Sequence, residues 1–327
     1  MNMELFKALL KRLISSLIVL FISISIIFLL IRVSPGDPAQ KFLGPGLSPR
    51  LLENVKASYS LNNSLSEQYF YFVKNFLSLN LGVSYTYRLP VLSVIAEYLP
   101  FTLLFSLLSF LIQIFCSIVL VIFAGKYRGR IIDHLISRSF LALYSVPAFL
   151  IGLGLIYIFS VKLNMLPSSD LRSPEVQGQI LSQIWDIVSH LILPLLTLSL
   201  PGLAIFYTYL RDNTEEIYNK PFITYLRSMG VSEKTILKKH IIPNAISPLI
   251  SVAGIELGLL FSGAFITEVI FSLPGLGRLT MNAVFSRDYP LIIGCTFVSG
   301  LLILITNLAA DFIKFRIDKR YLKGIFN

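Results

Sequence analysis

The amino-acid pattern predicts an all-α polytopic membrane protein with six transmembrane helices. Of the 327 residues, 55% are hydrophobic and 14% are charged, whereas about 25% are charged in an ordinary soluble domain. The hydrophobic residues gather in long runs without charge, and most lysines and arginines lie between those runs. Long apolar runs of this kind favour helices, because a helix satisfies its backbone hydrogen bonds within the bilayer.

Each of the six runs is long enough to cross a membrane. The first, Leu13–Ile31, holds 19 residues without charge, close to the length of about 20 that a hydrocarbon core requires. No small-x-small cleavage motif follows it, so we expect a retained helix rather than a signal peptide. The other five predicted spans are Tyr98–Gly125, Ser139–Val161, Ile187–Leu210, Asn244 to about Ser272, and Tyr289–Ala310.

The distribution of positive charge predicts the sidedness of the protein. Of the 28 lysines and arginines, 18 lie in segments 1–12, 125–138, 211–244 and 314–327, and 10 lie in the segments on the opposite side. Cytoplasmic loops carry an excess of lysine and arginine. We therefore expect both termini and the loop 211–244 in the cytoplasm.

This topology divides the chain into four parts. Residues 1–31 form the N-terminal segment and first span, and 32–97 form an extracytoplasmic segment in which Leu51–Tyr59 and Ser66–Leu79 have the patterns of short helices. Residues 98–314 form a core of five helices that includes the loop 211–244, and 315–327 form a basic tail.

Several site types are not supported by the sequence. Cys116 and Cys295 lie inside apolar spans, and the three histidines are scattered, so we expect neither a disulfide, a metal site nor a cofactor. The net charge of +10 forms no basic stripe interleaved with aromatic residues, which argues against nucleic acid as a partner. Gly125-Lys126 lacks the upstream glycine and the following hydroxyl residue of a P-loop, so ATP phosphates would bind to another subunit.

The polar stretch 221–243 lies between two apolar spans and predicts two short helices. Gly230 ends the first helix as a C′ residue would, Ser232 begins the second as an N-cap, and Pro243 ends it. The first helix has an apolar face with the helical spacing i, i+3, i+4 and i+7, made of Phe222, Tyr225, Leu226 and Met229. Because so short a helix is marginal alone, it requires a surface, which is either the lipid headgroup layer or a partner protein.

The twelve residues between Gly230 and Pro243, with Ile242 before the proline, resemble the "EAA" loop of ABC-importer permeases. Further segments, in the same order along the chain, are similar to the permeases of dipeptide, oligopeptide and nickel ABC importers. These segments are Phe28–Arg32 with Pro35–Ala39, Gly82–Tyr85, Arg88–Val91, Leu99–Pro100, Ser145–Phe149, His190–Pro194, Glu268–Phe271, Pro274–Leu279 and Arg287–Pro290.

The resemblance implies a type I ABC-importer permease fold in the cell membrane of a prokaryote. It also implies a second homologous permease, two ATP-binding subunits that hydrolyse the ATP, and an external solute-binding protein, so that this chain is not itself an enzyme. In this family the loop is the coupling helix that docks in a groove of the ATPase. The residues that the resemblance places in that role are Phe222, Tyr225, Leu226, Met229, Gly230 and Pro243.

The fifth predicted span carries a glycine pair and two carboxylates. Gly254 and Gly258 form a GxxxG pair, which favours close approach of a neighbouring helix. Glu256 lies about 200° round the helix from Gly254, so it either lines a passage shared with a second permease or is a protonated carboxyl hydrogen-bonded between helices. Glu268 is expected near the outer gate, where the family pattern also has an acid.

Two other classes of protein could also have six membrane helices: a secondary transporter or channel, and an intramembrane enzyme. A secondary transporter would show inverted repeats with interrupted helices, and neither these nor an HExxH motif of a metalloprotease is present. Channel filters leave weaker traces, so a secondary transporter or channel stays the alternative. Arg278 and Asp288 on the last outer loop either contact the solute-binding protein or pair with each other, and the sequence does not identify the solute.

Overall fold

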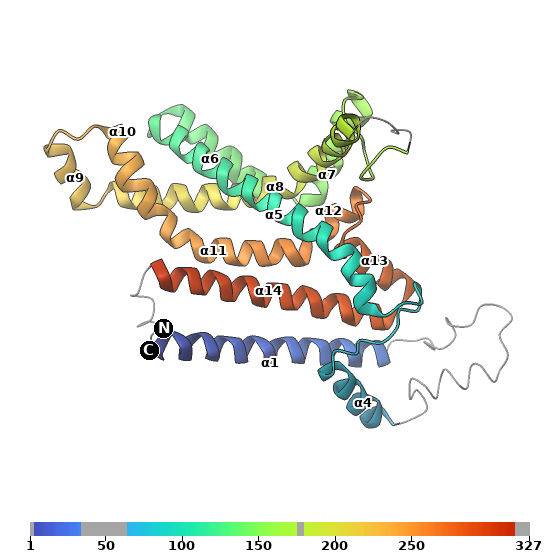
Figure 1. Ribbon diagram of the computed structural model, residues 1–327. Helices are drawn as coiled ribbons and strands as arrows, with labels where there is room; N and C mark the ends of the chain where they lie inside the picture. The colour runs from blue at the N-terminus through green and yellow to red at the C-terminus, as the bar shows by residue number, and fades with distance from the viewer. Residues whose placement is uncertain (1–2, 34–63, 175–179, 318–327) are drawn as a thin grey trace.

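The computed structural model describes residues 3–33, 64–174 and 180–317. These residues are almost entirely helical, and the part of the chain described contains one isolated β-bridge, between Val83 and Pro90, and no strand. Long helices run roughly parallel to one another, and α1 (Met3–Val33), α14 (Tyr289–Ile317) and α11 (Ile242–Gly263) lie side by side (Figure 1). The predicted all-α class is confirmed.

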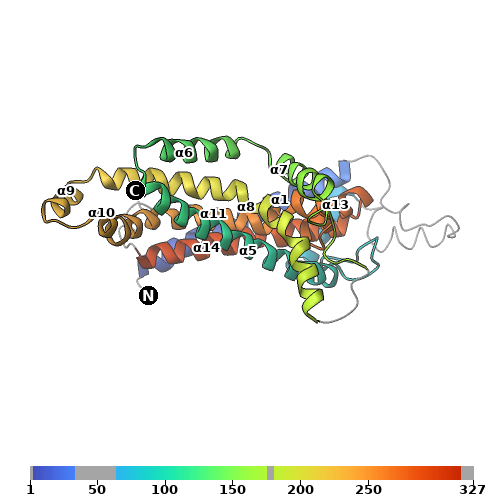
Figure 2. The same cartoon turned by 90° about the horizontal axis from the view of Figure 1, so that it is seen from above.

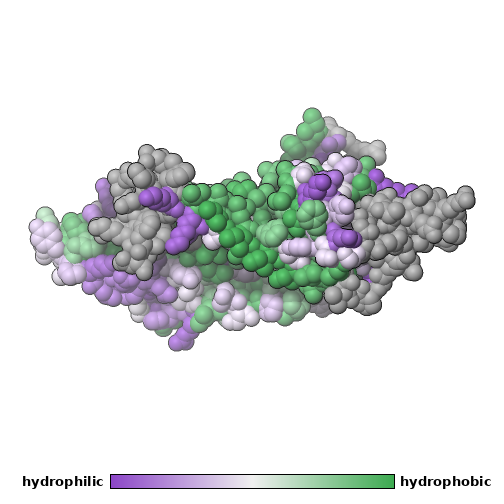
Figure 3. Space-filling model, turned by 90° about the horizontal axis from the view of Figure 1, so that it is seen from below, coloured by the Kyte–Doolittle hydropathy of each residue, from purple (hydrophilic) through white to green (hydrophobic). Residues whose placement is uncertain are grey.

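Five segments of the described chain are long and apolar enough to cross a membrane as continuous spans. They lie in α1, in α5 (Val91–Lys126), in α8 (Ile180–Tyr218), in α11 together with α12 (Phe265–Ile270), and in α14. Because these segments lie side by side, one face of the molecule carries a hydrophobic belt between more polar ends (Figure 3). All five coincide with spans that the charge-poor runs predicted.

The remaining predicted span, Ser139–Val161, is bent rather than one straight helix. The chain forms α6 (Ile131–Tyr144), then α7 (Ala148–Leu155), which continues as the π-helical turn η1 (Ile156–Lys162). The two halves are bent by 103° at the break. Pro147 explains the break, because the ring of a proline disfavours helical dihedrals in the preceding residue. Counted as one bent span, this pair brings the total to six.

The segment between α1 and α5 contributes one described helix, α4 (Leu65–Leu77), which matches the prediction for Ser66–Leu79. Ser64 and Glu67 form a reciprocal capping box at its start. The ring of Phe28 in α1 stacks on that of Phe72 with their centroids 4.6 Å apart, which holds α4 against α1. The other helix predicted in this segment, at 51–59, lies outside the described residues.

The centre of the bundle is joined by polar side chains that α5 directs inward. Ser106 donates a hydrogen bond to the Leu260 carbonyl of α11 at 2.9 Å, and the hydroxyls of Ser109 and Ser199 of α8 lie 2.8 Å apart. Gln113 lies so close to Gly202 of α8 that a Cβ there would fall 2.4 Å from the Gln113 Oε1 atom. Helices α5, α8 and α11 therefore form one closely packed unit.

Candidate functional site

The predicted amphipathic helix is present as α9 (Pro221–Ser228), at the end of the molecule where α8 leaves the bundle (Figure 1). Pro221 occupies the first turn, where its missing N–H has no cost. Gly230 adopts φ +78°, the left-handed conformation that ends a helix and that glycine tolerates best. Ser232 then caps α10 (Glu233–Thr235) by accepting a hydrogen bond from the Thr235 N–H at 3.4 Å.

Helix α9 has one face packed on the chain and one face left open. Ile223 is fully buried, and Leu226 packs against the same hydrophobic cluster, which includes Tyr218 and Ile236. The open face carries three large side chains with exposed fractions of 41% for Phe222, 64% for Tyr225 and 62% for Met229. Of the four residues predicted to form one docking face, three are therefore exposed, whereas Leu226 packs inward and helps to hold α9 in place.

The prediction that Pro243 ends the second helix is wrong. After α10 the chain continues as the π-helical turn η2 (Ile236–Ile241) and then directly as α11, in which Pro243 lies in the first turn. A proline inside a helix removes one hydrogen bond and crowds the carbonyl four residues earlier. The wider π-helical turn immediately before Pro243 accommodates that crowding, so α10 and η2 run without a break into α11.

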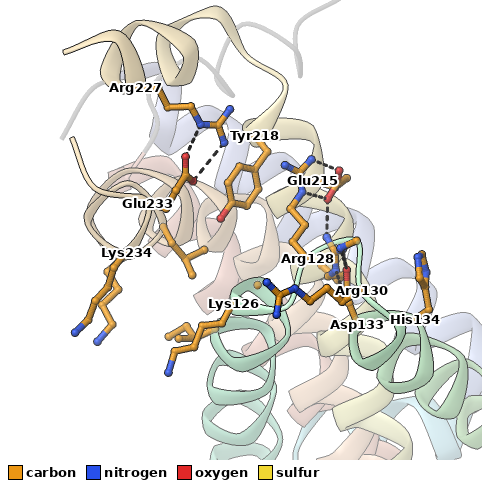
Figure 4. Close-up of a pocket in the computed structure, with 16 residues that line it drawn as sticks. Lys126, Arg128, Arg130, Asp133, His134, Glu215, Tyr218, Arg227, Glu233 and Lys234 are labelled. Atoms are coloured by element: carbon orange, nitrogen blue, oxygen red, sulfur yellow. Dashed lines mark hydrogen bonds and ion pairs between the residues drawn. The ribbon is translucent and has the colours of Figure 1, made fainter. Parts of the chain in front are cut away.

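A network of charges anchors the neighbourhood of α9 to the bundle (Figure 4). Arg211 of α8 donates to the buried Asp133 of α6 at 2.6 and 3.0 Å, and to Glu215 at 2.7 Å. Glu215 also accepts two hydrogen bonds from Arg128 in the turn between α5 and α6. This pairing raises the pKa of the Arg128 guanidinium. The network thus ties α6 and the end of α5 to α8.

The ring of Tyr218 continues this network towards α9. The Arg128 guanidinium carbon lies 4.2 Å from the ring centroid of Tyr218, and that of Arg227 in α9 lies 5.7 Å from it. Both distances fit cation–π contacts. Arg227 in turn donates to Glu233 of α10 at 2.5 and 3.3 Å. Only the pair Arg211 and Glu215, four residues apart on one helix, could have been found from sequence spacing.

The glycine pair of the fifth span faces α14. A Cβ on Gly254 would lie 2.0 Å from the Ala310 Cβ, and one on Gly258 would lie 2.7 Å from the Thr306 hydroxyl oxygen. The two helices therefore approach too closely for any larger side chain. Glu256 lies on the other side of α11, half-buried, and makes no hydrogen bond or ion pair within the described part of the chain.

Glu268, which the sequence predicts to lie near the outer gate, is fully buried inside this chain. Its carboxylate accepts hydrogen bonds from the Thr102 hydroxyl at 2.7 Å and from the N–H groups of Gly277 at 2.7 Å and Arg278 at 3.2 Å. The last two lie in the first turn of α13 (Leu276–Ser286). Glu268 therefore caps α13 and joins it to α5.

Arg278 and Asp288, predicted either to pair with each other or to contact a solute-binding protein, each bind other residues of this chain. Asp288 is fully buried and accepts hydrogen bonds from the Ser84 hydroxyl at 2.6 Å and the Thr86 N–H at 2.9 Å. Arg278 donates to the Ser272 carbonyl. The two residues do not pair with each other in the described structure, and Asp288 instead fixes the segment before α5.

Comparison with known families decides the identity of the chain. Residues 117–323 match the family described as binding-protein-dependent transport system inner membrane component. Residues 5–106 match the N-terminal region of the membrane components of these systems. The chain belongs to this family. It is accordingly a multi-pass protein of the prokaryotic cell membrane and a permease subunit of an ABC importer.

Two curated relatives cover almost the whole chain. The "Probable peptide ABC transporter permease protein y4tP" of Sinorhizobium fredii is 32% identical over 95% of this chain and 97% of its own length. The "Nickel import system permease protein NikB" of Staphylococcus aureus strain MRSA252 is 32% identical over 97% of this chain and 92% of its own length. In importers of this family, separate subunits hydrolyse ATP.

A solved structure shows the same fold. A chain of the MetNI methionine ABC transporter, captured in inward-facing conformations, is similar with a TM-score of 0.52 and 17% identity, over 72% of this chain and 98% of the other. The type I importer permease fold predicted from the sequence is thus confirmed. Family members act in general with a second permease, ATPases and a solute-binding protein.

Proposed function

We propose that this permease pairs with a second homologous permease and that its α9 docks into a groove on one ATPase partner, which couples ATP hydrolysis to solute import. The open face of Phe222, Tyr225 and Met229 carries this proposal, because exposed large apolar side chains on one side of a helix are typical of helix-in-groove recognition. The opposite face of α9 is fixed by the buried Ile223. The docking helix is thus presented on a rigid base.

The charge network supports a route by which ATPase movement reaches the spans. A displacement of α9 acts on Arg227, then through the ring of Tyr218 on Arg128, and from there on the ion pairs with α8 and α6. The continuous passage from η2 into α11 provides a second connection, directly to the fifth span. Both routes consist of side chains and helices in contact, as transmission between distant sites requires.

The same proposal includes the sidedness predicted from the charges, with both termini and α9 in the cytoplasm. The start of α1 and the end of α14 lie at the end of the molecule where α9 projects (Figure 1). Arg12 of α1 forms an ion pair with Asp311 of α14 there. Cysteines at Lys234 and Arg172 test this sidedness: an impermeant thiol reagent added outside should label Arg172→Cys only. Labelling of Lys234→Cys from outside would contradict it.

We propose peptides, or small solutes such as nickel complexes, as the cargo, delivered by an external solute-binding protein. The relatives named for peptide and nickel transport support this class. Glu256 is proposed to line the passage shared with the second permease and to favour cationic groups on the solute. Its half-buried carboxylate on the side of α11 away from the glycine pair supports this role.

The decisive experiment for the function is uptake into proteoliposomes of the assembly purified through a tag on this chain. ATP on the ATPase side should drive uptake of solute that the binding protein delivers, and uptake should stop when ATP is withheld. Uptake driven by an ion gradient alone, without ATP or binding protein, would instead support a secondary transporter or channel.

A further inference from the structure

An open cleft lies at the cytoplasmic end of the bundle, beside the base of α9. It has a volume of about 900 Å³ and lies between the turn joining α5 to α6, the end of α8, and the segment from α10 to η2. Lys126 at the end of α5 and Lys234 of α10 both line the cleft, and Figure 4 shows them on separate elements. The cleft is therefore bordered by elements far apart in the sequence.

The cleft has more positive than negative charge. Its three carboxylates, Asp133, Glu215 and Glu233, are each bound by an arginine: Arg211, Arg128 and Arg227 respectively. Four further cations line the cleft: Lys126, Arg130, Lys234 and Lys238. All four are exposed and none pairs with a carboxylate within the described residues. Their charge is available for an anion, because the acidic groups are already occupied.

Exposed apolar side chains lie next to these cations along α5 and α6. Lys126 is the last residue of the span in α5, and Phe123, one turn earlier, is 44% exposed. At the start of α6, Ile131 is 77% exposed and Leu135 is 59% exposed. Clusters of lysine and arginine placed just cytoplasmic of a membrane-spanning helix are typical of sites for anionic phospholipid headgroups.

We propose that this cleft binds the phosphate headgroup of an anionic phospholipid from the cytoplasmic leaflet, with Lys126 and Lys234 as its principal cations and the acyl chains along Ile131 and Leu135. The proposal rests on the sidedness of the proposed function. The cleft is separate from the open face of α9, so a lipid here and an ATPase there do not compete for the same side chains. A phosphate held between Lys126 and Lys234 ties the end of α5 to the segment that leads into α11.

The test measures phosphatidylglycerol retained on the detergent-purified chain by native mass spectrometry, with phosphatidylcholine as the neutral comparison. The double variant Lys126→Gln/Lys234→Gln should retain about tenfold less phosphatidylglycerol, since each cation near the membrane surface contributes substantially to anionic-lipid binding. The matched control is Lys220→Gln/Lys239→Gln, which removes two lysines that do not line the cleft. The control should retain phosphatidylglycerol as the wild type does.

Equal retention by both double variants would overturn the proposal. It would also be overturned if sn-glycerol 3-phosphate displaced the lipid at equal concentration, because the site would then be one for a soluble phosphate. If the cleft variant lost its ATPase partner but kept phosphatidylglycerol, the cations would belong to the ATPase interface, which also excludes the lipid site. The thiol labelling described above is independent, so failure of the sidedness and failure of the lipid site are distinguishable.

Discussion

Replacing Met229 by alanine should weaken ATPase binding without disturbing the permease itself. Fully burying a large apolar side chain contributes about 1.5 to 3 kcal/mol, and 62% of Met229 is open for such burial. Docking can therefore gain about 1 to 2 kcal/mol from this residue. At about 1.4 kcal/mol per tenfold change in affinity, the dissociation constant should rise about five- to twentyfold. With Tyr225, which is 64% exposed, the double alanine variant should weaken binding about a hundredfold.

The assay is the affinity of the purified ATPase for this permease in lipid nanodiscs, measured together with the thermal unfolding midpoint. Thr224→Ala is the matched control, because Thr224 is exposed on α9 but lies about 140° round the helix from Met229. Unfolding midpoints should stay unchanged for all variants, since surface substitutions usually alter stability by less than about 0.5 kcal/mol. Wild-type affinity of the Tyr225→Ala/Met229→Ala variant would refute the docking of α9.

Three further variants test the interior. Glu268→Ala should lower stability by about 1 to 3 kcal/mol, because it leaves the buried donors of Thr102 and α13 without an acceptor; an unchanged unfolding midpoint would contradict the capping role. Gly254→Ala should reduce the yield of folded protein, whereas Gly154→Ala, with no atom within 4 Å of the added Cβ, should not; equal yields would contradict close packing of α11 on α14. Glu256→Gln should keep the fold but reduce uptake of cationic solutes relative to neutral ones, and an unaltered preference would assign Glu256 a structural role.

The spans were predictable because membrane crossing imposes length and the exclusion of charge, both of which can be counted in one sequence. The break between α6 and α7 was not recognised, although Pro147 stands at the break, because prolines also occur within continuous membrane helices. Pro248 lies inside α11 without ending it. Whether a proline breaks a membrane helix depends on how neighbouring helices pack around it. That packing cannot be inferred from the amino-acid composition of the span.

The end of α9 and the start of α10 could be predicted because Gly230 and Ser232 act through local backbone conformation. The division of its apolar face could not be predicted, since the burial of Leu226 depends on contacts with Tyr218 and Ile236 from other helices. The ion pair of Asp133 with Arg211 joins residues that are 78 positions apart. A single sequence offers no spacing rule for such a pair, and the same holds for Glu268 and Thr102.

Chemical cross-linking from α9 tests the central claim most directly. In the assembled importer, with Cys116 and Cys295 replaced by alanine, Met229→Cys should cross-link efficiently to the ATPase through a short bifunctional maleimide. Thr224→Cys, from the side of α9 that faces away, should cross-link poorly. If the two positions reacted equally with the ATPase, or if neither reacted while ATP-driven uptake stayed intact, the open face of α9 would not be the docking surface.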